Sequence, residues 1–330
     1  MSEIDLLDRQ LIENIVFNGF QAKVSGIRKF ASGFVNRNYE VELEDSTFQR
    51  FVVRIYQVVG RRSRSYTEKR ILQYLDCARL LPAPLAVDPP FSLENDGSKE
   101  YLVLTRLPGT NLGELLPTLN HDEQFQVGFQ VGTFLRRLHS IVYDYFGELS
   151  EHSLLRFASE RDWVYSRAEN LLDQCEKHGI MSVKEMRWLQ SQFRQAESFL
   201  DQKQGVLTHG DLNSGNIIVD RVDEQYRVTG FVDFENSTVG SAEMDFIPLQ
   251  LQHQESPRLY EGVRSGYQLS LDDEYFKQRL ELFELLLDLQ VLVDVAHALT
   301  GPVIRGSTDT PNLPIQHIKR IHNKLKVKCS

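Results

Sequence analysis

The stretch LTHGDLNSGNIIVD, residues 207–220, constrains the fold more than any other part of the sequence. It places His209, Asp211, Asn213 and Asn216 within eight residues and follows them with the apolar run 217–219. Short polar side chains that crowd together are typical of a turn, and an apolar β-branched run is typical of a strand. A carboxylate and a carboxamide therefore lie five residues apart in a loop that leads into a strand.

A second carboxylate, Asp233, follows the next strand-like segment, 226–232. If 216–220 and 226–232 pair as a hairpin, Asn216 and Asp233 become neighbours at one edge, with Asp211 over them. Amide and carboxylate oxygens suit a hard divalent cation such as Mg²⁺. A separate carboxylate near that cation can orient a hydroxyl and accept its proton. Phosphoryl transfer from a nucleotide requires these groups.

The overall composition limits the classes of partner. The chain has 330 residues, of which 41% are hydrophobic and 25% charged, and its net charge of −9 argues against general nucleic-acid binding and favours neutral or cationic small partners. The basic cluster at 61–64 suits a solvated loop or an anion contact. The three cysteines, Cys77, Cys175 and Cys329, are widely spaced, so they indicate neither a disulfide framework nor a metal site. An acidic N-terminus and an apolar region, 285–299, that is interrupted by two aspartates favour a cytoplasmic protein without a membrane partner.

The hydrophobic pattern changes from strand-rich to helical along the chain. We expect strands over 27–31, 38–43, 47–56 and 101–105 and helices over 3–17 and 66–80. Further helices are expected over 120–139, 160–178, 182–203, 243–252, 258–268, 272–300 and 312–326. Asn120 and Glu123 predict a capping box at the start of the first of them. The order indicates an α+β fold with a small β-rich lobe, 1–106, and a large mainly helical lobe, 107–330, that carries the hairpin.

The order Asp-x4-Asn, a strand pair and then Asp-Phe matches the catalytic pattern of kinases. Here it reads His209-Gly-Asp211-Leu-Asn-Ser-Gly-Asn216, followed by Asp233-Phe-Glu235. The His-Gly-Asp and Asp-Phe-Glu motifs resemble those of the aminoglycoside phosphotransferase and choline kinase superfamily. The resemblance implies a two-lobed protein-kinase-like fold and a kinase that uses ATP or GTP with Mg²⁺.

The resemblance also implies roles for the matching positions. Asp211 would be the catalytic base, and Asn216 and Asp233 would bind Mg²⁺. His209 would brace the loop, Glu235 would assist the metal directly or through water, and Asp245 would hydrogen-bond backbone amides of the catalytic loop. The alternative is that the polar side chains of the loop only satisfy turn amides.

Elements upstream would hold the nucleotide. Arg54 lies in the third strand, where kinases place a phosphate-contacting lysine, and Glu68 in the next helix is its natural ion-pair partner. The loop between the first two strands offers Ser32, Gly33 and Asn38 for the phosphates, although its single glycine departs from the usual glycine-rich pattern. Backbone groups of Thr105 to Leu107 are expected at the nucleotide base. The alternative for Arg54 and Glu68 is that both side chains are exposed on the surface. The alternative for the loop is a plain hairpin turn that binds no phosphate.

The resemblance also implies that the acceptor lies over the catalytic loop, against helices of the large lobe. The expected helix 272–300 carries an acidic stripe, which consists of Glu274, Glu281, Glu284 and Asp288, with Asp294 further on. The stripe would suit an aminated or polyhydroxylated acceptor, but it could also be a solvated face. Asn213 and Asn236 could bond an acceptor hydroxyl or serve the loop structure. An aminoglycoside, a choline-like molecule and a sugar all fit this picture.

Two other classes of protein share parts of the pattern. A binuclear metal phosphoesterase also has Gly-Asp and Gly-Asn pairs, but it requires a histidine where Ile217 follows Asn216. A non-catalytic nucleotide-binding protein would be indicated by loss of Asp211, Asn216 or Asp233, and all three are present. Protein phosphorylation is less favoured, because no Ala-Pro-Glu element follows Asp233.

Overall fold

The computed structural model describes residues 4–30, 36–44, 50–56, 64–77, 83, 86–87, 100–149, 155–251, 256–269 and 274–300. The chain divides into two compact units, each built from three stretches. The first unit comprises 1–138, 209–237 and 248–269, and the second comprises 139–208, 238–247 and 270–330. The lobe boundary between residues 106 and 107 stays a prediction.

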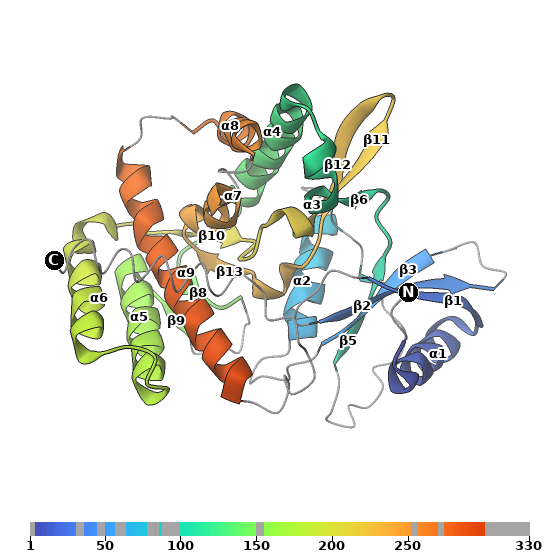
Figure 1. The fold of residues 1–330 in the computed structure, drawn as a ribbon, viewed down its shortest axis with the longest axis horizontal. Coiled ribbons are helices and arrows are strands. Elements are labelled where there is room, and N and C mark those ends of the chain that lie inside the picture. The colour runs from blue at the N-terminus through green and yellow to red at the C-terminus, as the bar shows by residue number, and fades with distance from the viewer. Residues whose placement is uncertain are drawn as a thin grey trace. The chain divides into compact units, whose positions relative to one another are not determined.

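The first unit begins with a helix and an antiparallel five-stranded sheet (Figure 1). The helix is α1 (Leu6–Phe20), and the strand order is β1-β2-β3-β5-β4. The strands are β1 (Val24–Lys29), β2 (Arg37–Leu43), β3 (Arg50–Ile55), β5 (Tyr101–Thr105) and β4 (Ala86–Val87). Alternate residues of the strands and one face of α1 bury a shared apolar core that includes Ile12, Ile15, Tyr39, Val41 and Val53.

Helix α2 (Arg64–Cys77) follows β3, as the sequence predicts, and it buries Ile71, Leu72 and Leu75. After β5 the chain forms β6 (Thr110–Asn111), the short helix α3 (Leu112–Leu115) and a 3-10 turn (Leu116–Thr118). These pieces lead into the long helix α4 (His121–Leu138). The N-terminal part of the chain is therefore a sheet with two helices, close to the predicted order.

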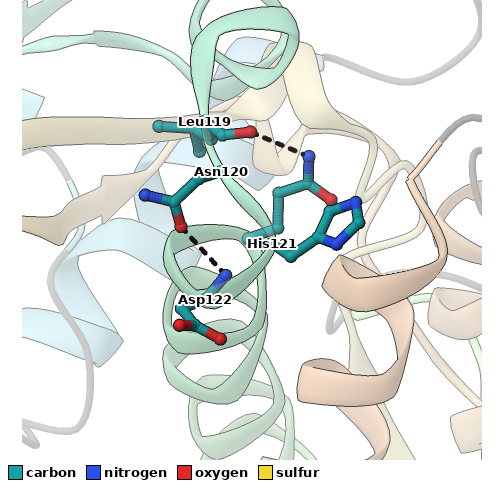
Figure 2. A pocket seen from close by; sticks show the side chains of 5 residues that line it. Leu119, Asn120, His121 and Asp122 are labelled. Carbon is teal, nitrogen blue, oxygen red and sulfur yellow. Dashed lines mark hydrogen bonds between the residues drawn. The ribbon is translucent and has the colours of Figure 1, made fainter.

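Asn120 and Glu123 form the capping box that the sequence predicts for α4. The Asn120 Oδ1 accepts from the backbone N of Glu123 at 3.0 Å, and the Asn120 backbone N donates to Glu123 Oε2 at 2.8 Å. Figure 2 shows the shallow pocket at this end of the helix, where Gln124 Nε2 also donates to the Leu119 carbonyl at 3.0 Å. The backbone N atoms of Asp122 and Glu123 thus both donate to Asn120 Oδ1, and none of the predicted site residues lines this pocket.

Helix α4 packs closely against α8 (Pro257–Tyr267) in the first unit (Figure 1). The predicted hairpin is present as β11 (Ile217–Val222) and β12 (Gln225–Phe231), with β6 on the other side of β11. Its turn residues Asp223 and Glu224 have φ of 47° and 63°, as a two-residue hairpin turn requires. Phe231 faces Ile217 across the hairpin, so the start of one strand adjoins the end of the other.

In the described residues, the second unit contains a small five-stranded sheet and three helices. The strand order is β7-β10-β13-β8-β9, from β7 (Val142–Tyr143), β10 (Gly205–Thr208), β13 (Thr238–Gly240), β8 (Phe146–Gly147) and β9 (Arg156–Phe157). The helices are α5 (Glu160–Lys177), α6 (Val183–Gln195) and α9 (Glu274–Thr300). No helix in the described ranges is long and apolar enough to cross a membrane.

Two predicted helices differ from the structure. The helix expected over 182–203 ends at Gln195 and gives way to a 3-10 turn (Glu197–Phe199), because the chain must turn there to enter β10. The helix expected over 243–252 starts as a 3-10 turn (Ala242–Phe246) and becomes α7 (Ile247–Leu251) with Pro248 in its first turn. The helix expected over 312–326 lies outside the described residues.

Candidate active site

Asp211 and Asn216 lie side by side in the loop between β10 and β11. Asn216 Nδ2 donates to the Asp211 carbonyl at 2.8 Å and lies 3.5 Å from Asp211 Oδ2. Asn213 Nδ2 donates to Asp211 Oδ1 at 2.9 Å, and its own Oδ1 accepts from Gly215 N at 2.8 Å. The polar cluster therefore both builds the turn and orients the Asp211 carboxylate.

The hairpin brings Asp233 to the same edge. Val232 N donates to the Asn216 carbonyl at 3.0 Å, which places Asp233 one residue beyond this bond. Asp233 has a left-handed backbone with φ of 73°, and a 3-10 turn (Phe234–Asn236) follows it. Aspartate tolerates this conformation better than most residues, and such strain is concentrated at functional sites.

His209 and Gly210 shape the loop ahead of Asp211. His209 is fully buried, and its Nε2 lies 3.0 Å from the Val232 carbonyl, so this nitrogen carries the proton and Nδ1 accepts from Asp211 N at 3.4 Å. Gly210 has φ of 82°, and a Cβ there would lie 2.2 Å from the Asn236 carbonyl oxygen. The histidine fixes the loop to β12, and only glycine fits the next position.

Arg54 is held at the centre of a buried polar network. Its Nη1 contacts both Glu68 oxygens, at 3.0 Å and 2.8 Å, and Asp233 Oδ1 at 2.7 Å. Glu68 is fully buried and also accepts from Tyr56 Oη at 2.5 Å and from Phe234 N at 3.2 Å. The expected Arg54–Glu68 pair is present, and it also reaches the turn that follows β12.

Two asparagines at the start of β2 support this network. Asn38 Oδ1 accepts from Arg54 Nε at 3.0 Å. Asn36, just before the strand, donates from Nδ2 to Glu235 Oε2 at 2.6 Å. Asn38 was predicted as a phosphate contact, and in the structure it orients the arginine; its contact with phosphate stays a prediction. Ser32 and Gly33 lie outside the described residues.

The electrostatics of the site follow from burial and from the crowding of carboxylates. Burial raises the pKa of Asp211 to about 7, and the charges of Asp233 and Glu235 add to this effect, while the hydrogen bond from Asn213 opposes it. Burial alone would lower the pKa of Arg54, but Asp233 and Glu68 raise it above its usual range. Arg54 therefore stays charged, and Asp211 ionises near neutral pH.

The donor set suits a divalent cation that is shared with phosphate oxygens. Because the amide nitrogen of Asn216 is used on Asp211, its oxygen is the atom left as a ligand, and Asp233 supplies a carboxylate. No cluster of three or more His, Cys, Asp or Glu side chains in the described ranges could hold a metal by itself. Mg²⁺ usually takes one or two protein carboxylates with phosphates and water, so two protein ligands match this ion.

The segment that was predicted for the nucleotide base is fixed by Arg106. Its Nε donates to Glu40 Oε1 at 3.0 Å, and its Nη2 donates to the Gly109 carbonyl at 2.9 Å. Its Nη1 also contacts the Leu107 carbonyl. Thr105 ends β5 opposite Phe51, and base binding at Thr105 and Leu107 stays a prediction.

The remaining sequence candidates lie in the second unit. Asp245 is buried and contacts His139 Nε2 at 3.1 Å. On α9, Glu274 and Glu281 are exposed, Glu284 is half-buried and Asp288 is fully buried. Asp294, which sequence reasoning grouped with Asp288 in an apolar region, is exposed and accepts from Gln290 Nε2 at 3.0 Å. The acidic stripe is therefore solvated at its start and buried only at Asp288.

Sequence reasoning assigned no role to Asn36 or Tyr56. Tyr56 carried a usable signal, because it follows Arg54 by two residues in the strand expected over 47–56, and side chains two apart in a strand share a face. Asn36 lies before the strand, so this pattern did not identify it. The buried cluster of Arg279, Glu160 and Glu243 could not be predicted from the sequence, because an arginine in a helix is normally expected to be exposed.

The fold and this arrangement of side chains define a protein-kinase-like phosphotransferase. Residues 26–279 match the model of the phosphotransferase enzyme family, which is more than half of the chain. The chain belongs to this family, and it is an enzyme that transfers a phosphoryl group to a hydroxyl.

Solved structures of aminoglycoside phosphotransferases share the fold over almost the whole chain. One is a thermostable mutant of APH(4)-Ia in a ternary complex with ADP and hygromycin B, with a TM-score of 0.69 and 15% identity, covering 97% of this chain and 99% of that one. Another is the GDP and kanamycin complex of APH(2")-IIIa, with a TM-score of 0.68 and 13% identity, covering 96% and 99%. A third is the streptomycin-ATP-APH(2")-IIa complex, with a TM-score of 0.62 and 15% identity, covering 98% and 97%. At these identities the likeness establishes the fold alone.

Proposed function

We propose that this phosphotransferase moves the γ-phosphoryl group of ATP or GTP, with Mg²⁺, to a hydroxyl of an aminoglycoside-, choline- or sugar-like acceptor. The observation that carries the proposal is the arrangement of Asp211, Asn216 and Asp233 around one edge of the hairpin. A passive turn would not require a buried arginine on Asp233 or a raised pKa on Asp211.

The side chains have separate tasks in this reaction. Asp211, held by Asn213, accepts the proton of the acceptor hydroxyl as its oxygen bonds to the γ-phosphorus and the bond to the β-phosphate oxygen breaks. Asn216 and Asp233 would hold Mg²⁺, which neutralises charge on the phosphates when it is bound. Arg54 contributes a fixed positive charge for the phosphate oxygens, and Glu68 keeps it in place.

The identity of the co-substrate and the acceptor rests on weaker support. The similar structures hold ADP, GDP or ATP and an aminoglycoside, which supports a purine nucleotide and a polyhydroxylated amine here. The net charge of −9 favours a neutral or cationic acceptor.

Turnover with a panel of acceptors tests this function. The purified chain with Mg²⁺ and either ATP or GTP should phosphorylate at least one aminoglycoside, amino alcohol or sugar. Asp211→Ala should lower kcat by about 10²- to 10⁴-fold, because a general base contributes about that much, while nucleotide affinity stays within about threefold. Asp223→Asn, in the turn of the same hairpin, is the matched control. Unchanged turnover in Asp211→Ala would refute its role as the base.

The metal ligands are tested by binding rather than turnover. Asp233→Ala should weaken Mg²⁺-dependent nucleotide binding by about tenfold or more, because one of two protein ligands is lost. Calorimetric titration with and without Mg²⁺ separates this effect from direct nucleotide contacts. A titration identical to that of the wild type would contradict the assignment of Asp233.

A further inference from the structure

Asn36 and Glu235 connect two segments that lie 199 residues apart in the sequence. Asn36 Nδ2 lies 2.6 Å from Glu235 Oε2, and the side chain of Asn36 is almost fully buried, with 8% of its surface exposed. A carboxylate only accepts hydrogen bonds, so the amide nitrogen must face Glu235. This contact is a charge-assisted hydrogen bond and stronger than one between neutral groups.

The turn of residues 233–236 is therefore held from the start of β2 at two points. Asn38 orients Arg54, which contacts Asp233, and Asn36 contacts Glu235 directly. Both carboxylates of the Asp-Phe-Glu sequence are thus placed by side chains that are two residues apart.

Asn36 is a neutral donor, so its hydrogen bond fixes the Glu235 carboxylate and leaves the negative charge of that carboxylate in place. The other carboxylate of this turn, Asp233, has its charge paired with Arg54, whose Nη1 lies 2.7 Å from Asp233 Oδ1. The Oδ1 of Asn36 is buried and has no hydrogen-bond partner in the described part of the chain, and such an atom marks a place that a bound ligand or water can complete.

We propose that Asn36 is a positioning residue that holds Glu235 in the metal-binding turn and so strengthens binding of the divalent cation with the nucleotide. The inference rests on the proposed function, because that function places the cation at this turn. It assigns to Glu235 a defined orientation and to Asn36 a role that acts through Glu235 rather than on the substrate.

Binding of Mn²⁺ in the presence of ADP, followed by the electron paramagnetic resonance signal of free Mn²⁺, tests the inference. Asn36→Ala should weaken Mn²⁺ binding by about tenfold, as for the loss of one charge-assisted hydrogen bond, while ADP binding without metal changes by less than about twofold. Asn36→Leu keeps the volume and burial of the side chain without its donor, and it should show the same loss if the alanine variant folds poorly. Asn170→Ala, on the exposed face of α5, is the control.

A double-mutant cycle separates positioning from a general structural effect. In a Glu235→Ala background, Asn36→Ala should weaken Mn²⁺ binding by less than about twofold, because the contact is already gone. An equal loss in both backgrounds, or wild-type affinity in Asn36→Ala and Asn36→Leu, would overturn the inference and leave the proposed function standing. Failure of the wild-type chain to bind Mn²⁺ with ADP would overturn both.

Discussion

At the scale of single residues, Asp211 shows how burial prepares a side chain for proton transfer. Its carboxylate is half-buried near two other carboxylates, and its pKa of about 7 lies where a base can alternate between its two states at neutral pH. The same environment costs stability when Asp211 is ionised. Function and stability therefore oppose each other at this position.

Asp211→Asn should stabilise the metal-free protein, and the gain should depend on pH. A carboxyl group whose pKa is raised on folding contributes stability that is complete below about pH 4, its unfolded value, and is lost as the pH rises through about 7. The free energy of unfolding of the variant should therefore exceed that of the wild type by an amount that grows from pH 4 to 7, up to about 4 kcal/mol, and then stays level. Urea unfolding in EDTA at a series of pH values measures this difference, and a difference that is constant with pH would contradict it.

At the scale of elements, the pair α4 and α8 depends on four glycines that let two helical backbones touch. A Cβ atom added to any of them would lie 1.9–2.2 Å from a backbone carbonyl oxygen of the partner helix. The four are Gly128 and Gly132 on α4 and Gly262 and Gly266 on α8. Glycine normally weakens a helix, so its use here shows that close approach outweighs propensity. The hairpin rests on this pair through Gln130, whose side chain bonds Val228 N at 3.0 Å and the Tyr226 carbonyl at 3.2 Å.

Gly132→Ala should destabilise the protein although alanine is the better helix former. Propensity would stabilise by about 1 kcal/mol, but a Cβ placed 1.9 Å from the Val263 carbonyl oxygen forces the helices apart, at a cost of about 3 kcal/mol. Gly179→Ala is the control. Gly179 has φ of 62°, but no atom of the described residues lies within 4 Å of its added Cβ, so only backbone strain of about 1 kcal/mol is expected. Thermal and urea unfolding compare the two variants; a stabilised Gly132→Ala would show that the crossing is not close-packed.

At the scale of the whole molecule, the candidate catalytic and metal-binding residues come from one compact unit although they span distant parts of the chain. Arg54, Glu68, Asp211, Asn216 and Asp233 all belong to the first unit, which draws on three separate stretches. The second unit is held by a different buried network. In it Arg279 on α9 contacts Glu160 Oε1 on α5 at 2.5 Å and Glu243 Oε1 at 2.6 Å, with about 1% of its side chain exposed.

Arg279→Met should destabilise the second unit strongly, because two carboxylates would remain buried without their cation. Removal of one partner from a buried ion pair costs about 3–5 kcal/mol. Arg161, also on α5, forms an exposed pair with Glu197, and Arg161→Met should cost less than about 1 kcal/mol. Urea unfolding of both variants measures the contrast. Similar small losses would mean that the buried network is as weak as a surface pair.

The sequence by itself determined the local chemistry and most of the regular elements. The Asp211-x4-Asn216 spacing, the turn at Asp223 and Glu224, and the apolar periods of α2 and α4 are encoded by neighbouring residues, so they can be predicted without a structure. The two-residue strands β7, β8 and β9 could not be predicted, because two residues carry no period.

Only the tertiary structure decided which distant polar groups meet. Asn36 and Glu235 are 199 positions apart in the sequence, and Arg54 and Asp233 are 179 apart. Arg279 is buried against Glu160, which is 119 positions away. Short-range patterns report propensity and burial along one element, whereas these contacts depend on how separate elements pack. Hydrogen bonds between such groups, and the burial that raises the pKa of Asp211, exist only once that packing has removed water from around them.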